Sequence, residues 1–146
     1  MMKRYTFWLW TAVVVIFVNF TLHSIGLFIN PTPQDPTHAQ MLHLMETYPL
    51  KLGPLFHPTM ASLFTALSSC LSLLSLLAGL TIVYLLKKRV EVGVMKGLIA
   101  INLLVFGIGL VIFAALTFLL PVILTGLIVV CLLGAFLTAR SVPAAT

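Results

Sequence analysis

The feature that most constrains the fold is an uncharged stretch near the C-terminus. Residues 97 to 139 contain no Lys, Arg, Asp or Glu, and a single helix of that length would be about 64 Å long. The hydrocarbon core of a bilayer is only about 30 Å thick. The stretch must therefore turn back on itself, and Pro121 indicates the place, because proline interrupts a helix. We expect a tight hairpin around residues 119 to 122, between two membrane-spanning helices.

The composition places the whole chain in a membrane. Of its 146 residues, 61% are hydrophobic and 8% are charged, whereas a soluble domain carries about 25% charged residues. A membrane span needs about 20 mostly apolar residues. Four segments qualify, and they cover residues 7–29, 59–86, 97–118 and 122–139. We predict an all-α polytopic membrane protein, in which residues 1–146 form a single domain, a four-helix bundle with an outer loop at 30–58.

The basic residues predict the topology. Except for Lys51 in the outer loop, they gather before the first segment, between the second and third, and after the fourth: Lys3 and Arg4, then Lys87, Lys88, Arg89 and Lys96, then Arg140. Loops rich in Lys and Arg stay in the cytoplasm, so we expect an inner (plasma) membrane protein with both termini cytoplasmic. The net charge of +5 thus reflects topology and anionic headgroups and indicates no nucleic-acid partner. The expected partners are the bilayer and other membrane proteins or further copies of the chain.

The first segment has a second interpretation as a signal peptide. "MMKR" is a basic leader, and Ser24-Ile25-Gly26 has the small-x-small form of a cleavage site. We favour a membrane span, because an even number of spans keeps Arg140 on the same side as the basic residues 87–96.

The outer loop contains a predicted short helix. Asp35 followed by Pro36 is a typical helix start, with the carboxylate as cap and proline at the first helical position. The helix would cover residues 36–48, and its apolar residues form one broad side. This pattern is typical of a helix that lies on the outer membrane face or caps the bundle.

Small and polar residues predict which helix faces meet, since close packing and hydrogen bonds drive helix association in lipid. They recur at helical spacing in each span: Asn19, His23 and Gly26; Thr65, Ser68, Ser72, Ser75 and Gly79; Asn102, Phe106 and Gly109; Gly126 and Gly134. We expect these four stripes to face one another.

His23 is the candidate functional residue, because an imidazole in hydrocarbon needs a partner. In a structural role it bonds Asn19, a serine of the second span, or the outer loop. In a functional role it binds a ligand, a quinone or a proton, as ionisable groups inside spans often do. We expect a small polar ligand site beneath the outer loop, formed by His23 with Asn19, Ser68 and His57. The leading hypothesis is a non-catalytic accessory or interaction protein, or a holder of a small lipophilic ligand.

Two cofactors are alternatives, although we predict none. A haem- or quinone-linked redox subunit would use His23, and bis-histidine haem would need His57 as the second ligand. A Cu(I) site on the outer face would use the stripe of His38, Met41 and Met45, because thioethers and imidazole suit Cu(I). The same methionines also suit simple packing.

Catalysis finds little support in the sequence, so an enzymatic role stays open but is not favoured. The three acidic residues, Asp35, Glu46 and Glu91, all fall outside the predicted spans. Cys70 and Cys131 lie in different spans without the spacing of a metal or redox motif, and we interpret both as packing residues.

The motifs "HSIGLF", "AQMLHLMETYPLKLG" and "FLLPVIL" together resemble a family of small, uncharacterised four-helix bacterial inner-membrane proteins. The resemblance covers most of the chain, and the architecture is distantly similar to that of DoxX-like proteins. It implies a four-span fold but no agreed activity. The family pattern has aromatic and glycine residues at the start of the second span, where this chain has "HPTMASLFTALSS". The resemblance therefore implies no shared ligand site there.

Overall fold

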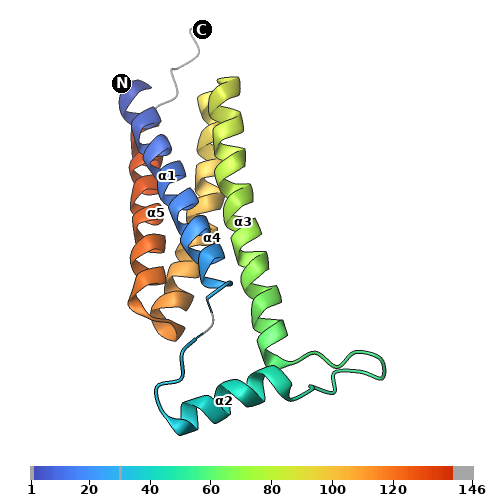
Figure 1. The fold of residues 1–146 in the computed structure, drawn as a ribbon. Coiled ribbons are helices and arrows are strands. Elements are labelled where there is room, and N and C mark those ends of the chain that lie inside the picture. Colours follow the sequence, from blue (N-terminus) through green and yellow to red (C-terminus); the bar gives the residue numbers. More distant parts are fainter. Residues whose placement is uncertain (1, 30, 140–146) are drawn as a thin grey trace, which may run out of the picture. The chain divides into compact units, whose positions relative to one another are not determined.

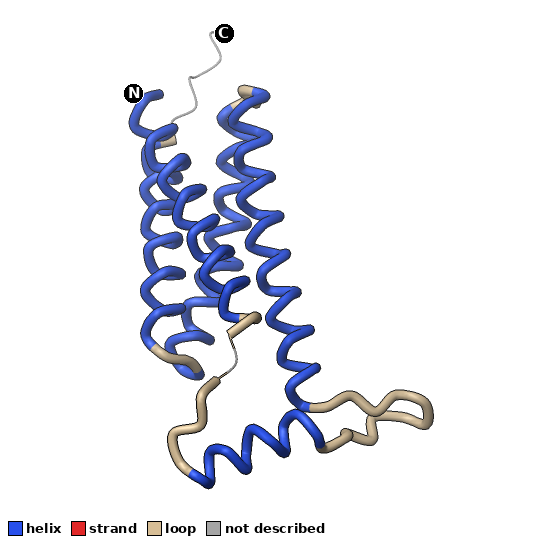
Figure 2. Tube along the Cα trace, in the orientation of Figure 1, coloured by secondary structure: helices blue, strands red, loops and turns tan. Residues whose placement is uncertain are grey.

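The computed structural model describes residues 2–29 and 31–139. Over these residues the chain forms five α-helices and no strand (Figures 1 and 2): α1 Met2–Gly26, α2 Pro36–Thr47, α3 Met60–Lys88, α4 Val92–Leu116 and α5 Leu119–Thr138. All of these helices except α2 are long and apolar enough to cross a membrane. The predicted all-helical, four-span architecture is confirmed, and by length and composition of its helices the chain is a multi-pass membrane protein. Arg140, used in the topology prediction, lies outside the described residues.

Residue contacts group the chain into two compact units. Among the described residues, the bundle unit contains residues 2–20 and 75–139, and the α2 unit contains those within Thr21–Leu74. The boundary crosses α1 and α3, so each of these helices contributes one part to each unit.

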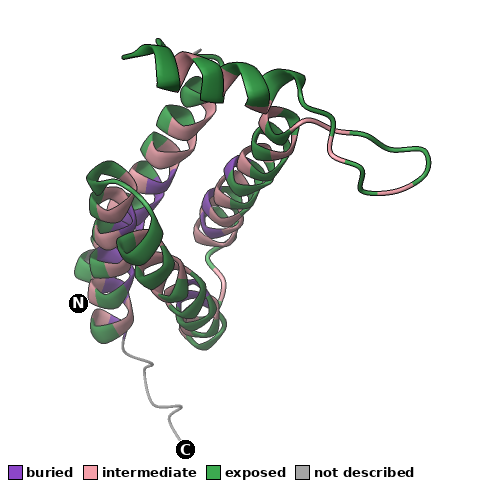
Figure 3. Cartoon of the chain, turned by 90° about the horizontal axis from the view of Figure 1, so that it is seen from below, coloured by how far each residue is buried: buried purple, intermediate pink, exposed green. Residues whose placement is uncertain are grey.

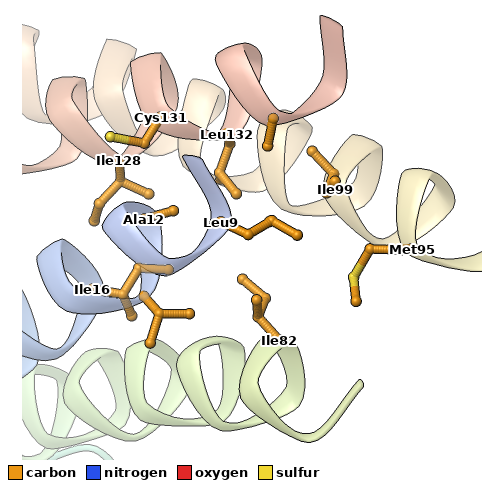
Figure 4. Close-up of a cluster of buried hydrophobic side chains, with 11 residues drawn as sticks. Leu9, Ala12, Ile16, Ile82, Met95, Ile99, Ile128, Cys131 and Leu132 are labelled. Atoms are coloured by element: carbon orange, nitrogen blue, oxygen red, sulfur yellow. The ribbon is translucent and has the colours of Figure 1, made fainter. Parts of the chain in front are cut away.

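The core of the bundle unit is built from apolar side chains of all four long helices (Figure 4). They converge from Leu9, Ala12, Val13 and Ile16 of α1, Ile82 of α3, Met95 and Ile99 of α4, and Ile128, Cys131, Leu132 and Ala135 of α5. Lipid is as apolar as these side chains, so close packing rather than escape from water holds the helices together. Cys131 packs in this core as predicted, whereas Cys70 is exposed on α3.

Two glycines of the bundle unit pack directly against side chains of α1. A Cβ added at Gly134 would lie 2.7 Å from the ring of Trp8, and one at Gly79 would lie 3.2 Å from Ile16. Both glycines belong to the predicted stripes, and the missing side chain leaves room for a large side chain of α1 at each position. Gly109 differs from the prediction, since a Cβ there would have nothing within 4 Å.

The hairpin between α4 and α5 turns at Thr117 and Phe118, two residues before the predicted range. The Thr117 backbone N–H and its hydroxyl both donate to the carbonyl of Phe113, at 2.9 and 2.8 Å, and close the end of α4. Pro121 falls in the first turn of α5. Backbone N–H groups in a first turn have no helical partner, so proline is tolerated there and does not itself form the turn.

The helix ends differ from the predicted span ends in other places too. α1 ends at Gly26 rather than residue 29, although hydrogen bonds of the tighter i to i+3 type continue to Ile29. α4 begins at Val92 rather than residue 97. Its first turns therefore include Lys96, whose ammonium lies 4.8 Å from the centroid of the Phe136 ring. A cation over the face of an aromatic ring is attracted by the ring's electrons, so Lys96 has a favourable contact within the helix.

The residue that follows α3 has a strained backbone conformation, which can be tested by substitution. Arg89 has a φ of 50°, the left-handed conformation that favours glycine, and the N–H of Val90 bonds the carbonyl of Leu85. We expect Arg89→Gly to raise the free energy of unfolding by about 1 kcal/mol, because glycine adopts this conformation without strain. Thermal unfolding in detergent measures the change. Arg89→Ala is the control that removes the charge and keeps the strain, and equal stabilities of the two variants would contradict the prediction.

Helix α2 begins where it was predicted to begin. The Asp35 carboxylate accepts a hydrogen bond from the backbone N–H of His38 at 2.8 Å, and Pro36 occupies the first turn. After α2 the chain forms a loop at residues 50–58, here named the Leu55 loop. Its neck is closed by a 2.8 Å bond from the Leu50 N–H to the Pro58 carbonyl. The Thr59 hydroxyl then accepts from the Ser62 N–H at 3.2 Å and caps α3.

Candidate ligand site at His23

His23 lies near the end of α1, within the α2 unit. Its side chain is half-buried, and its Nε2 atom is buried with no hydrogen-bond partner among the described residues. A polar atom removed from water without a partner costs several kcal/mol. Native proteins rarely keep such an atom unsatisfied, and each case calls for a bound water, ion or ligand, or for a functional reason.

Ser72 on α3 is the second such group in the same unit. It is 5% exposed, and its Oγ is buried without a partner among the described residues. Other hydroxyls of α3 donate to the carbonyl four residues earlier: Thr65 to Ala61 at 3.0 Å, Ser69 to Thr65 at 2.7 Å and Thr81 to Leu77 at 2.7 Å. Ser72 makes no such bond, so its hydroxyl keeps both its donor and its acceptor capacity.

Helix periodicity relates the two groups. His23 follows the buried Ile16 by seven residues, and Ser72 precedes Gly79 by seven. Positions seven apart lie on the same side of a helix, about two turns along it. A Cβ added at Gly79 of α3 would touch the Ile16 side chain of α1. On each helix the unpartnered group therefore lies on the same side as the residue of the Ile16–Gly79 contact, and both groups belong to the α2 unit.

The predicted pocket residues are distributed differently. Ser68 is half-buried on α3, His57 is exposed in the Leu55 loop, and Asn19 is half-buried in the part of α1 that belongs to the bundle unit. No hydrogen bond joins any of them to His23 in the described chain. Their place in a site therefore stays a prediction. Ser72 was assigned to the small-residue stripe but not to the pocket, although its spacing from Gly79 was visible in the sequence.

Comparisons with models of known protein families, with curated proteins and with solved structures find no match. The function must therefore be inferred from the residues of this chain. Membership of the small inner-membrane protein family stays a prediction.

The predicted copper stripe on α2 is only partly assembled. Met41 and Met45 line an open groove of about 590 Å³, together with Met60 at the start of α3. His38 is engaged elsewhere, since its Nδ1 accepts from the backbone N–H of Gln34 at 3.2 Å. In a neutral ring the proton then resides on Nε2, so neither nitrogen offers a lone pair in this arrangement. Cu(I) binding would require His38 to break this bond, and the site stays a prediction.

The three carboxylates lie on other elements than α1, which carries His23. Asp35 caps α2, Glu46 is exposed on α2, and Glu91 is exposed just before α4. A serine–histidine pair that acts as a nucleophile needs a third group, usually a carboxylate, to orient the imidazole. None of these three carboxylates lies inside a candidate span.

Proposed function

We propose that the protein is a non-catalytic inner-membrane protein, with both termini cytoplasmic, that holds a small lipophilic ligand at His23 and Ser72. The observation that carries the proposal is the pair of buried, unpartnered polar atoms, Nε2 of His23 and Oγ of Ser72, in one unit. Their alternative partner, water, is scarce in the hydrocarbon region of a bilayer.

The chemistry of the two groups defines the class of ligand. An imidazole nitrogen and a hydroxyl can both donate a hydrogen bond to an oxygen atom. The rest of the ligand must be apolar, because the surrounding helix surfaces are apolar and open to lipid. A lipophilic molecule with one carbonyl or hydroxyl oxygen meets both requirements. The absence of a carboxylate from the candidate spans supports binding over hydrolysis.

A redox role is the second candidate, because the same Nε2 could bond a quinone oxygen or bind haem iron. Bis-histidine haem would need another imidazole, and His57, the predicted partner, is exposed in the Leu55 loop. A quinone needs only hydrogen-bond donors. It therefore fits the two unpartnered groups better than haem.

Native mass spectrometry of the detergent-purified protein, with an absorbance spectrum of the same sample, tests the proposal. We expect an additional defined mass on the wild-type chain, and its loss in His23→Ala and in Ser72→Ala, because each substitution removes a polar contact. A Soret band would identify haem, and a quinone spectrum would identify the redox alternative.

Two matched variants control this experiment. His57→Ala removes an exposed imidazole, and Ser69→Ala removes a hydroxyl that already bonds its own backbone. Both should keep the additional mass. A wild-type chain that carries no additional mass, or a mass retained in His23→Ala, would refute ligand binding and favour an accessory role that depends on a protein partner.

A further inference from the structure

The Leu55 loop exposes large apolar side chains outside the membrane-spanning helices. Leu55 is 95% exposed, Phe56 67% and Leu52 65%. Figure 3 shows the loop between α2 and α3 as exposed along most of its length. Contiguous apolar groups on a surface mark a site that contacts a membrane or a protein.

Backbone contacts hold the loop in a defined conformation in which these side chains are exposed. Its neck is held by the bond between Leu50 and Pro58 and by the antiparallel bridge between Pro49 and Thr59. The neck fixes the two ends of the loop, and the apolar side chains between them are exposed. A closed neck with an exposed apolar tip is therefore a feature of the fold.

The position of the neck places the loop at the membrane surface. Thr59 caps α3, and Met60 is the first residue of a candidate membrane span. Leu55 precedes Met60 by only five residues, so its backbone lies at most about 18 Å from the point where the span begins. The tip is thus within reach of the lipid headgroups and the upper acyl chains.

The surface next to the loop is also suited to lipid. The groove beside the neck is lined by Leu50, by Met60 and by the apolar side of α2, including Leu44 and Tyr48. An apolar surface therefore continues from the start of the span to the loop and to α2. Within residues 50–58, Lys51 is the only charged residue, and a lysine beside apolar groups favours anionic headgroups.

We propose that the Leu55 loop inserts into the phospholipid leaflet at whose surface α3 begins. Leu52, Leu55 and Phe56 enter the acyl region, and the ammonium of Lys51 stays at the phosphates, as long basic side chains do at interfaces. The occupant of this apolar surface is lipid rather than a protein partner, because the loop joins a membrane span directly. This inference is independent of the ligand proposed at His23.

Spin labelling in nanodiscs of phosphatidylcholine and phosphatidylglycerol tests the insertion. The label is placed at Leu55→Cys in a full-length background with Cys70→Ala and Cys131→Ala, and the control is Glu46→Cys. Glu46 is exposed on the side of α2 opposite to the groove. We expect the Leu55 label to collide more often with oxygen than with a water-soluble nickel complex, and the Glu46 label to show the reverse.

Two results would overturn the proposal. Free access of the nickel complex to the Leu55 label would place the loop in water, and protection from both oxygen and nickel would show that protein covers it. If the cysteine-free background does not fold, Leu55→Trp in the native chain is compared with Glu46→Trp in brominated phosphatidylcholine. Greater quenching of the Leu55→Trp variant supports insertion, and equal quenching refutes it.

Discussion

Gly134→Ala is expected to destabilise the protein although alanine is the better helix former. The new Cβ would lie 2.7 Å from the Trp8 ring, so the ring or the helix must move, and such overpacking costs about 1–3 kcal/mol. Gly109→Ala is the matched control, because its Cβ meets nothing within 4 Å. Both variants gain the same helix propensity of about 1 kcal/mol. Their free energies of unfolding should therefore differ by the overpacking cost alone.

Both variants are heated in detergent, and size-exclusion chromatography then measures how much folded protein remains. The comparison of the two variants measures this difference. Combining Gly134→Ala with Trp8→Leu should remove most of the penalty, because the smaller side chain leaves room for the new methyl group. Equal stabilities of the Gly134 and Gly109 variants would show that Trp8 does not pack on α5 in the folded protein.

Leu132→Ala should produce the second large effect. Leu132 is fully buried in the bundle core, whereas its neighbour Leu133 is 45% exposed. Lipid is as apolar as leucine, so moving the side chain out of water contributes little here, and the cost of Leu132→Ala arises mainly from the cavity it leaves. We expect a loss of about 2 kcal/mol for Leu132→Ala, at the low end of values for soluble cores.

Leu133→Ala provides the comparison, since lipid can fill the space it leaves. Its free energy of unfolding should stay within about 0.5 kcal/mol of wild type, as surface substitutions usually do. Steric trapping or unfolding in a denaturing detergent gives both values. If Leu133→Ala were the more damaging variant, Leu133 rather than Leu132 would face the core.

The sequence predicted best those features that depend on local chemistry. Asp35 and Pro36 predicted the start of α2, because a cap is decided by neighbouring residues. The uncharged stretch predicted a hairpin, because a single helix of that length would be about twice as long as the hydrocarbon core is thick. The turn itself was placed two residues late, since proline is tolerated inside a first turn and the hydroxyl of Thr117 gave no comparable signal.

The candidate site was less predictable, because it depends on which helix faces meet. His23 was identified from its chemistry alone, and its role in a site stays a prediction. The choice between Ser68 and Ser72 needed the approach of Gly79 to Ile16, which is a contact between distant parts of the sequence. Gly109 shows the same limit of sequence-based prediction. A glycine at helical spacing does not reveal whether another helix packs against it.

The short connection between α4 and α5 determines how this part of the chain can enter the bilayer. Only Thr117 and Phe118 separate the two helices, and neither they nor the helix ends beside them carry a charge. During synthesis no soluble segment separates α4 from α5, because α5 follows after two residues. We do not expect α4 to cross the membrane alone before α5 is made. We therefore expect α4 and α5 to be released into lipid together, as one preformed helical hairpin, during biogenesis.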